Sequence, residues 1–583
     1  MTPDNSPKST KDPQFCGCLL SAITWLIGGE NGDFPAPARS PMKRSLLSET
    51  SRALALPSSI SEENGIALSR TESYLVTDAV RLNVRRRYSR QGSSADVPRT
   101  GITSLRLRRD PLRDFGYRYD IVGEAFGLGG FAKVFKVRDK YTGELRAAKR
   151  VPKDQISDNG LLRRELEMLL TLDHPHVIRL FEWFEIPDSI WMIQEFCTGG
   201  ELSEIVGKCT SREALKVIRQ ILLGLAYLDD RGVVHGDIKL ENCMFQSREP
   251  ESVVKIIDFG LSGLSRGNPA SPSVSPSSPK SDVTGKTGTL LYMSPELLSS
   301  LSPSNTLRRI TSKCDMWAVG IIAHILLTGD HPFWDRSEPF DETQMYSEIS
   351  RRRVEVSKID SEEAGDLVSH LLDTNSASRY SAQQALLHPC MQASAFLGSD
   401  VHSQLLSNLR SFKRFRPLAR VVLTIIAYQS ADRTNSALRE VFSLLDTDMN
   451  GVLSKIEIID GMTRLGLLIP SDIDVILDSI DADHSGEVDY TEFIAAGMSA
   501  DQVRNSWASD QAFAWFTQSK IGFIALSDLE AVVGPAEASS VMATYGQGGV
   551  LTRRGFRSFI DDVAKIKAEA ILPEPDYHVA PLS

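Results

Sequence analysis

At residues 233–242 the chain reads Val233-Val234-His235-Gly236-Asp237-Ile238-Lys239-Leu240-Glu241-Asn242, an apolar strand that opens into a polar loop. Sixteen residues beyond Asn242, the apolar run that begins at Val253 ends in Asp258-Phe259-Gly260. We therefore expect Asp237, Asn242 and Asp258 to converge where loops begin after short strands. One carboxylate of such a set orients a hydroxyl proton, while an amide and a second carboxylate hold Mg²⁺, which prefers hard oxygen ligands. The pattern indicates phosphoryl transfer.

Two features upstream point to a nucleotide. The turn Gly127-Leu128-Gly129-Gly130-Phe131-Ala132-Lys133-Val134 lies between two β-like runs, and its glycines let backbone amides approach phosphates. A purely structural hairpin is the alternative. Fifteen residues later, Lys149 ends an apolar strand, where it needs an anionic partner such as a phosphate and a carboxylate. Glu165, in the helical run that follows, is our candidate for that carboxylate, and Glu167 is a rival separated only by helix phase.

With these elements, in this order and spacing, residues 117–390 resemble the eukaryotic protein kinases. The resemblance continues through Ser294-Pro295-Glu296, through Asp315 to Gly320, and to Arg379, which pairs with the glutamate of the Pro-Glu element in kinases. It implies a bilobal kinase fold that uses ATP and Mg²⁺. It also implies that Glu195-Phe196-Cys197 is the adenine-binding hinge and that Glu201 lies at the ribose and substrate edge.

The resemblance further implies a role for each site residue. Asp237 would be the base, Lys149 the phosphate anchor paired with Glu165, and Asn242 and Asp258 the Mg²⁺ ligands. The predicted catalytic residues are Asp237, Lys239, Asn242 and Asp258. The predicted nucleotide-binding residues are Gly127, Gly129, Val134, Lys149, Glu165, Glu195, Cys197 and Glu201.

The chain departs from the kinase pattern at several points. Gly236 replaces the arginine beside the catalytic aspartate and so removes the cation that pairs with a phosphorylated activation loop in many kinases. Residues 266–286 form a Ser-Pro-rich insertion. These departures leave two alternatives open: a calcium-regulated pseudokinase scaffold, and a kinase regulated mainly by phosphorylation of the insertion.

Two loops fit the EF-hand calcium pattern, Asp446 to Glu457 and Asp481 to Glu492. They start 35 residues apart, as paired EF-hands do, and we expect Leu453 and Val488 to pair across a short two-strand contact. An acidic solvated turn is the alternative. The predicted oxygen ligands are Asp446, Asp448, Asn450, Val452 and Glu457 in the first loop, and Asp481, Asp483, Ser485, Glu487 and Glu492 in the second.

The repeat continues with two degenerate units. In the third, which begins at Thr517, Ile521 replaces an oxygen ligand and Lys520 adds repulsion. The fourth, Thr544 to Gly555, keeps glycine and the apolar eighth position but lacks acids. We expect these units to fold as a helical pair that binds little or no Ca²⁺.

Between the kinase and the EF-hands lies His402 to Gln429, in which basic and aromatic residues recur at helical spacing before Pro417. The segment resembles a target helix of calmodulin-like domains, which bind by apolar anchors and charge attraction. A plain packed linker helix is the alternative.

The chain has 583 residues, a length that allows about three or four domains, and its 42% hydrophobic and 24% charged residues are typical of globular protein. No run of about 18 apolar residues occurs, and the seven cysteines form no disulfide framework, so we expect an intracellular protein. Residues 1–114 carry 17 basic and 12 acidic residues, whereas residues 434–583 carry 10 and 23. We predict that the basic tail is disordered, with Cys16 and Cys18 as candidates for S-acylation.

Kinase, basic junction and calmodulin-like domain occur in the order that resembles the calcium-dependent protein kinases of plants and protists. The resemblance implies a cytoplasmic serine/threonine kinase that is inhibited by its junction and released by Ca²⁺. It also implies basophilic protein substrates. We further expect a monomer, no nucleic-acid partner, and peripheral membrane contact through acylation of Cys16 and Cys18. The predicted divisions are a disordered tail (1–116), a bilobal kinase domain (117–390), an autoinhibitory junction (391–433), an all-α calmodulin-like domain (434–570) and a C-terminal tail (571–583).

Overall fold

A computed structural model describes residues 115–569, except 129–131, 156–158, 250, 260–289, 300–310, 336–341, 352–353, 392–398, 431–435, 465–468 and 518–521. Every described element lies in one compact unit, residues 78–583. The predictions for Cys16, Cys18, the basic tail, the C-terminal tail and the Ser-Pro insertion fall outside the described residues. None of the helices in the described part of the chain combines the length and apolar character needed to cross a bilayer.

The first lobe is an antiparallel sheet with a few short helices. The sheet has the strand order β1-β2-β3-β5-β4 and is antiparallel at every pairing. Val137, Ala148 and Ile193 are fully buried beneath it because alternate residues of a strand point to one face. The elements are α4 (Phe115–Arg118), β1 (Tyr119–Leu128), β2 (Lys133–Asp139), β3 (Leu145–Pro152), η1 (Lys153–Gln155), α5 (Asn159–Leu169), β4 (Leu180–Glu185) and β5 (Ser189–Gln194).

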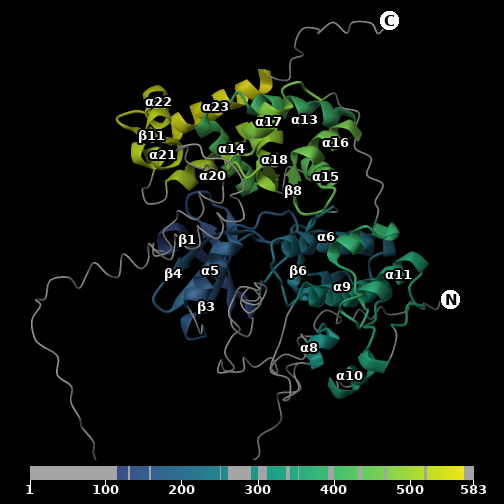
Figure 1. The fold of residues 1–583 in the computed structure, drawn as a ribbon. Helices are drawn as coiled ribbons and strands as arrows, with labels where there is room; N and C mark the ends of the chain where they lie inside the picture. The colour runs from purple at the N-terminus through teal and green to yellow at the C-terminus, as the bar shows by residue number, and fades with distance from the viewer. Residues whose placement is uncertain are drawn as a thin grey trace, which may run out of the picture. The chain divides into compact units, whose positions relative to one another are not determined.

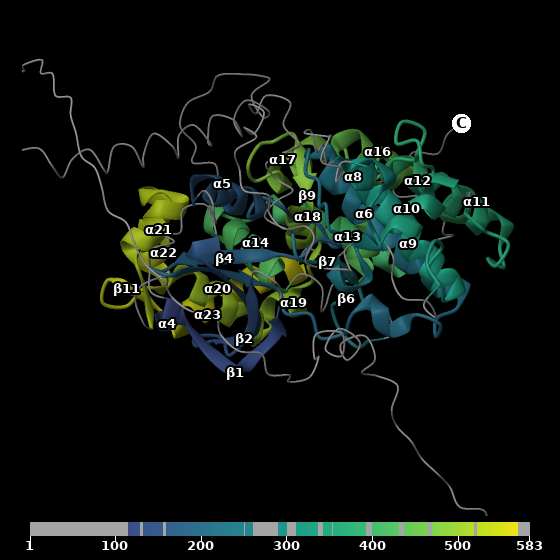
Figure 2. The ribbon, with the colours of Figure 1, turned by 90° about the horizontal axis from the view of Figure 1, so that it is seen from below.

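The second lobe is mainly helical and packs around α9 (Ser312–Thr328), whose residues from Cys314 to Leu326 are all buried. Thr210 begins the neighbouring α6 (Ser211–Asp230) with a reciprocal cap to Glu213, and Gly329 ends α9 in the left-handed conformation. The other elements are η2 (Leu202–Ile205), η3 (Leu240–Asn242), β6 (Cys243–Phe245), β7 (Val254–Ile256), α8 (Pro295–Ser299), α10 (Glu342–Arg351), α11 (Glu362–Leu371), α12 (Ala382–Leu386) and η5 (Pro389–Met391). In Figure 2 the strands β1, β2 and β4 lie apart from the helices α6, α9 and α11, so both lobes are visible.

The C-terminal part is built from EF-hand units around two junction helices. The junction helices are α13 (Ser399–Phe412) and α14 (Pro417–Ser430). The first EF pair comprises α15 (Ser436–Leu445), β8 (Val452–Ser454), α16 (Lys455–Arg464), α17 (Ile473–Ile480), β9 (Glu487–Asp489) and α18 (Tyr490–Gly497). The second comprises α19 (Ala500–Arg504), α20 (Ser506–Phe516), β10 (Phe523–Ala525), α21 (Leu526–Val533), α22 (Pro535–Tyr545), β11 (Val550–Thr552) and α23 (Arg553–Glu569).

One apolar core unites these EF units with the junction. Phe412, Leu418 and Val422 of the junction lie in the same buried cluster as Phe442 and Ile494 of the first EF pair. In Figure 1, α14 lies beside α18, and the two helices pack together. The observed architecture confirms the predicted fold class: a bilobal kinase fold followed by an all-α EF-hand region.

Candidate active site and calcium sites

The loop after α6 holds the carboxylate of Asp237 from two sides. Lys239 Nζ lies 2.6 Å from Asp237 Oδ2, and Asn242 Nδ2 donates to the same oxygen at 2.9 Å. The Asn242 amide also donates to the Asp237 carbonyl oxygen at 2.7 Å, which closes the loop on itself. These contacts bring together three of the four predicted catalytic residues and fix the direction of the Asp237 carboxylate.

The backbone of this loop is anchored from beneath by Asp315 of α9. The two oxygens of Asp315 accept the backbone N–H groups of His235 and Gly236 at 2.9 and 2.8 Å. Burial raises the pKa of Asp315 to about 7, although both hydrogen bonds favour the charged form. Gly236 has φ +75°, which a side chain would strain. The sequence placed Asp315 in a kinase motif, but it did not reveal this anchoring contact.

Asp258 follows β7 and contacts Lys149 of β3 from the other lobe. Phe259 beside it is buried, and its ring lies 4.9 Å from the ring of His235, which accordingly connects the two loops. Burial lowers the pKa of His235 to about 4, so its imidazole is neutral at physiological pH. Asp258, the fourth predicted catalytic residue, therefore lies where the two kinase lobes meet. The side chain of Glu165 in α5 is outside the described residues, so its pairing with Lys149 stays a prediction.

The strands β1 and β2, which flank the glycine-rich turn, pair as an antiparallel hairpin. Gly127 pairs with Val134, and the register shifts on both sides of Ala125. The pairing confirms a hairpin, and the role of its turn in nucleotide binding stays a prediction. Gly129 lies outside the described residues.

The predicted hinge follows β5. Glu195 forms an ion pair with Lys255, at 3.2 Å from Oε2 to Nζ, and accepts a hydrogen bond from the Gln246 side chain. Lys255 is fully buried and was missed in the sequence, although a lysine inside the apolar run from Val253 to Ile257 is a signal of such a pair. The carboxylate of Glu195 is thus used inside the protein, and its backbone N–H donates to the Arg179 carbonyl oxygen at 3.0 Å, so its role in adenine binding stays a prediction. Cys197 packs against the core of the helical lobe.

An acidic edge lies below the hinge at Glu201, just before η2. Ser203 Oγ donates to Glu201 Oε2 at 3.1 Å. Burial raises the pKa of Glu201, and the nearby carboxylates of Glu241 and Glu204 raise it further. Three acids therefore face one region near the catalytic loop.

Arg379 and Glu296 form the ion pair expected from the kinase pattern. Arg379 is fully buried, and its two terminal nitrogens lie 2.7 and 3.0 Å from the two oxygens of Glu296. Its Cζ also lies 5.1 Å from the ring centre of buried Trp317. This arrangement ties α8 to the end of the helical lobe.

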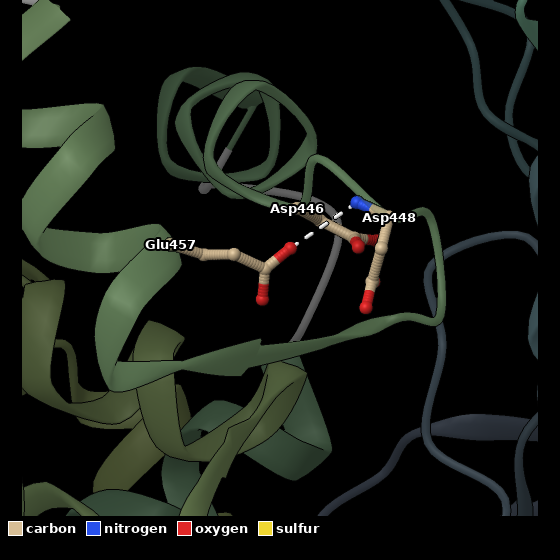
Figure 3. A group of neighbouring side chains, drawn as sticks. All are labelled: Asp446, Asp448 and Glu457. Carbon is tan, nitrogen blue, oxygen red and sulfur yellow. Dashed lines mark hydrogen bonds between the residues drawn. The ribbon is translucent and has the colours of Figure 1, made fainter.

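The first calcium loop connects α15 to α16. Gly451 N and Asn450 N donate to the two oxygens of Asp446 at 3.0 and 3.1 Å, which curls the loop around that carboxylate. Glu457 reaches back from α16, and its Oε1 accepts the backbone N–H of Asp448 at 3.2 Å (Figure 3). Asp446, Asp448 and Glu457 each present an oxygen within 4.8 Å of the others. Burial raises the pKa of Asp446 to about 7, with Glu457 and Asp448 adding to the shift.

The second loop, between α17 and α18, repeats this geometry. Gly486 N and Ser485 N donate to Asp481 at 2.8 and 2.9 Å, and Asp481, Asp483 and Glu492 present oxygens within 4.8 Å of one another. Burial raises the pKa of Glu492 well above its usual range, and Asp489 raises it further. Such crowded, desolvated carboxylates suit a divalent cation with hard oxygen preference, so the residues present fit Ca²⁺.

The remaining predicted ligands lie in place in the same loops. Asn450 Oδ1 accepts Val452 N at 2.9 Å, and Ser485 Oγ lies 2.9 Å from the carbonyl oxygen of Glu487. Val452 begins β8 and Glu487 begins β9, so the carbonyl of each lies where the loop becomes a strand, and its role as a calcium ligand stays a prediction.

The second EF pair folds as predicted. β10 pairs with β11 at Ile524 and Leu551, and helices flank both strands. Among the described residues, the two clusters of acidic side chains that could hold a metal ion both belong to the first EF pair.

The junction helices contact the kinase at the sheet. Tyr428 Oη donates to the Leu180 carbonyl oxygen at 3.0 Å, and Arg179 Nη1 donates to the Tyr428 carbonyl oxygen at 2.9 Å. Arg146 of β3 donates to Gln429 at 2.7 Å. These contacts place the end of α14 against β3, β4 and the residue before β4.

Comparisons with known proteins match both halves of the chain. The model of the protein kinase domain matches residues 121–391, and that of the EF-hand domain pair matches residues 435–496. Calcium-dependent protein kinase 3 of Plasmodium berghei is 33% identical over 66% of this chain and 67% of its own length. Calcium-dependent protein kinase 32 of Arabidopsis thaliana is 30% identical over 73% of this chain and 77% of its own length. Calcium-dependent protein kinase 4 of Plasmodium falciparum is 30% identical over 71% of this chain and 79% of its own length. The chain belongs to the calcium-dependent protein kinases.

This calcium-dependent protein kinase is a calcium-activated serine/threonine kinase that phosphorylates proteins with ATP and Mg²⁺ and binds Ca²⁺ through its EF-hands. The site agrees with that chemistry. Asp258 contacts Lys149 while 45% of its side chain stays exposed, so oxygen remains available for a cation. The EF-hand region regulates the kinase within the same chain.

Proposed function

We propose that Asp237 accepts the proton of the substrate hydroxyl, that Lys149 positions the phosphates of ATP, and that Asn242 and Asp258 are the Mg²⁺ ligands. The observation that carries this assignment is the double clamp on Asp237 Oδ2 by Lys239 and Asn242. Because both donors take the same oxygen, Oδ1 is left to meet the hydroxyl group. Bound Mg²⁺ neutralises charge on the phosphates and leaves the chain to supply orientation.

The test is phosphate transfer to a peptide by the full-length enzyme and by Asp237→Asn. We expect the rate constant to fall by at least about 100-fold, as removal of a general base does, while nucleotide binding is retained. Retained turnover in Asp237→Asn would contradict the assignment. Equal and negligible turnover in both proteins, with and without Ca²⁺, would contradict the kinase activity itself.

We further propose that the junction inhibits the kinase when calcium is low and is moved by calcium. The support is the shared core: Phe412 and Val422 of the junction are buried against the helices that carry the calcium ligands. A change in the angle between those helices must therefore move the junction. In the present arrangement the end of α14 lies at β3 and β4. We infer that this arrangement corresponds to the released state and that the inhibited state is a different one, with the junction over the substrate site.

Hydrogen–deuterium exchange on the full chain tests this second proposal. In chelator we expect the loop at 235–242 to be protected by the junction. On adding Ca²⁺, exchange at 235–242 should rise and exchange at 399–430 should change with the same calcium midpoint. A calcium-induced rise in activity without any change at 235–242 would contradict inhibition by the junction.

We propose basic protein segments as substrates. Glu201, Glu204 and Glu241 form the acidic edge described above, and such a cluster attracts arginine or lysine. The predictions of a cytoplasmic monomer and of acylation at Cys16 and Cys18 remain proposals that rest on the sequence alone.

A further inference from the structure

The first calcium loop lies directly against the kinase. Met449, at the fourth position of the loop, packs against the buried core of the kinase's helical lobe. Gly451 lies so close to two kinase rings that a Cβ there would be 2.4 Å from Tyr227 Cδ2 and 3.0 Å from His174 Cδ2. Gly451 also has φ +77°. The glycine is therefore required twice, once for the turn and once for the close approach of the kinase.

Arg231 of the kinase completes this contact. It follows the last residue of α6, and its Nη1 donates to the carbonyl oxygen of Asn450 at 3.1 Å. Its Cζ lies 3.9 Å from the centre of the Tyr227 ring, so the guanidinium contacts the ring while it binds the loop. Asn450 is a predicted calcium ligand, and Arg231 thus binds the backbone of a residue whose side chain faces the metal position.

The second calcium loop is held by a neighbouring kinase residue. Asp173 Oδ2 accepts the backbone N–H of Thr491 at 2.9 Å, and Thr491 immediately precedes the ligand Glu492. The other oxygen of Asp173 accepts Arg179 Nη2 at 3.2 Å, and Arg179 in turn binds the carbonyl oxygen of Tyr428 at the end of the junction. One fully buried kinase carboxylate therefore links the second calcium loop to the junction.

We propose that Asp173, His174, Tyr227 and Arg231 form a docking surface on the kinase, the loop seat, whose partner is the calcium-binding loop pair of the same chain. In this docked state both groups of carboxylate ligands are assembled within 4.8 Å. The loop seat contacts the backbone at Asn450, Gly451 and Thr491, the residues that set the turn of the first loop and the approach of Glu492. Docking therefore stabilises the metal-binding geometry, and calcium binding stabilises docking, because coupling between two sites is reciprocal.

This inference deepens the proposed regulation and rests on it, since it adds a direct route from calcium to the kinase beside the junction. The direction in which calcium affinity changes when Arg231 is removed distinguishes this proposal from simple electrostatics. Arg231 is a cation beside two cation sites, so by charge alone its removal would strengthen calcium binding. If the loop seat holds the loops in shape, removal of Arg231 weakens calcium binding instead.

The test is calorimetric titration of Ca²⁺ into the full-length chain, with wild type and Arg231→Ala compared. We expect Arg231→Ala to lower the calcium affinity about 5-fold to 150-fold, the range of ordinary coupling between sites. Arg212→Ala is the matched control: Arg212 is an exposed arginine in the first turn of the same helix α6, and its replacement should leave the affinity unchanged. An unchanged or increased affinity in Arg231→Ala would overturn the proposal.

A second variant guards against misfolding of the first. Met449 supplies no oxygen ligand, so Met449→Ala removes packing against the kinase and leaves the ligand set intact. We expect it to weaken calcium binding as well, and the double variant to lose less than the product of the two single losses, because both act through one contact. Independent, multiplicative losses would contradict a shared docking surface. Calorimetry measures calcium binding and does not depend on kinase activity. A kinase that is equally active in chelator would therefore contradict the proposed regulation, but the comparison of calcium affinities between the variants would still test the loop seat.

Discussion

Leu453 and Val488 pair directly in the short ladder between β8 and β9, and both are buried. Each is the eighth residue of its calcium loop, so the two loops share one small sheet. A change in the shape of one loop therefore reaches the other through the backbone. This relationship makes the two calcium sites a unit.

Glu492→Gln should accordingly affect both sites. The variant removes a closing ligand of the second loop, and we expect calorimetry on the full chain to find that site lost and the affinity of the first reduced about tenfold. Wild type should bind about two calcium ions, because the ligand oxygens are kept only in the first EF pair. Four sites in wild type, or an unaltered first site in Glu492→Gln, would contradict this account.

Glu201→Gln should weaken recognition of basic substrates. Loss of one charge-assisted hydrogen bond is worth about 1.5 kcal/mol or more, so KM for a peptide with an arginine upstream of the acceptor should rise about tenfold. KM for the same peptide with alanine in place of arginine should not change. Glu249→Gln, at an exposed position beyond β6, serves as the control. An equal effect of Glu201→Gln on both peptides would argue against the acidic edge as a substrate site.

Arg379→Ala should destabilise the kinase domain severely. It leaves the half-buried carboxylate of Glu296 without its arginine partner, a change that costs about 3 kcal/mol, the lower end of the range for buried pairs, because 28% of the Glu296 side chain is exposed. Arg379→Lys should not restore stability, since lysine cannot make the two-point contact. Arg163→Ala removes a pair with Glu185 in which the arginine side chain is 49% exposed, and it should cost less than about 1 kcal/mol. Thermal unfolding of the three variants measures the difference, and similar Tm values for Arg379→Ala and Arg163→Ala would refute the prediction.

Lys567 should make the stability of the EF-hand region depend on pH. Its Nζ is fully buried and donates to the Ala496 carbonyl oxygen at 2.9 Å, and burial lowers the pKa of Lys567 to about 7. In the unfolded chain the pKa is about 10.4. Between these values the unfolded chain binds one more proton than the folded chain, so stability rises with pH by about 1.4 kcal/mol per pH unit.

Lys567→Met should lose this part of the pH dependence. The measurement is thermal unfolding at pH 7, 8 and 9, and the control is Lys565→Met, because Lys565 lies on the same helix with a side chain that is 63% exposed. If wild type and Lys567→Met show the same slope of Tm with pH, the pKa of Lys567 is not lowered in the folded protein.

The parts of this protein that sequence reasoning predicted are those in which chemistry requires particular residues at short, fixed spacing. Asp237, Asn242 and Asp258 are separated by loops whose lengths are set by the strands between them, and the two calcium loops each carry their ligands within twelve residues. The ladder between Leu453 and Val488 followed from the same pattern. The choice between Glu165 and Glu167 could not be predicted from the sequence, because it depends on how the helix is rotated about its own axis.

The contacts between domains could not be predicted. Arg231 binds the backbone of Asn450, and Asp173 binds the backbone of Thr491, so neither contact requires a particular side chain on the other side. The partners are more than 200 residues apart in each case, and no local pattern joins them. The buried pair of Lys255 and Glu195 is an intermediate case, since a lysine within an apolar strand predicts an anionic partner without identifying it.

We propose that calcium bound by the first EF pair controls phosphate transfer at Asp237. The most direct measurement is the rate of peptide phosphorylation by the full-length enzyme across a titration of free Ca²⁺, for wild type and for Glu457→Gln/Glu492→Gln. We expect wild-type activity to rise steeply within about 10⁻⁷–10⁻⁵ M free Ca²⁺, the range of sensor EF-hands, and the double variant to stay at its rate in chelator. A wild-type enzyme that turns over equally fast in chelator and in calcium would contradict the claim.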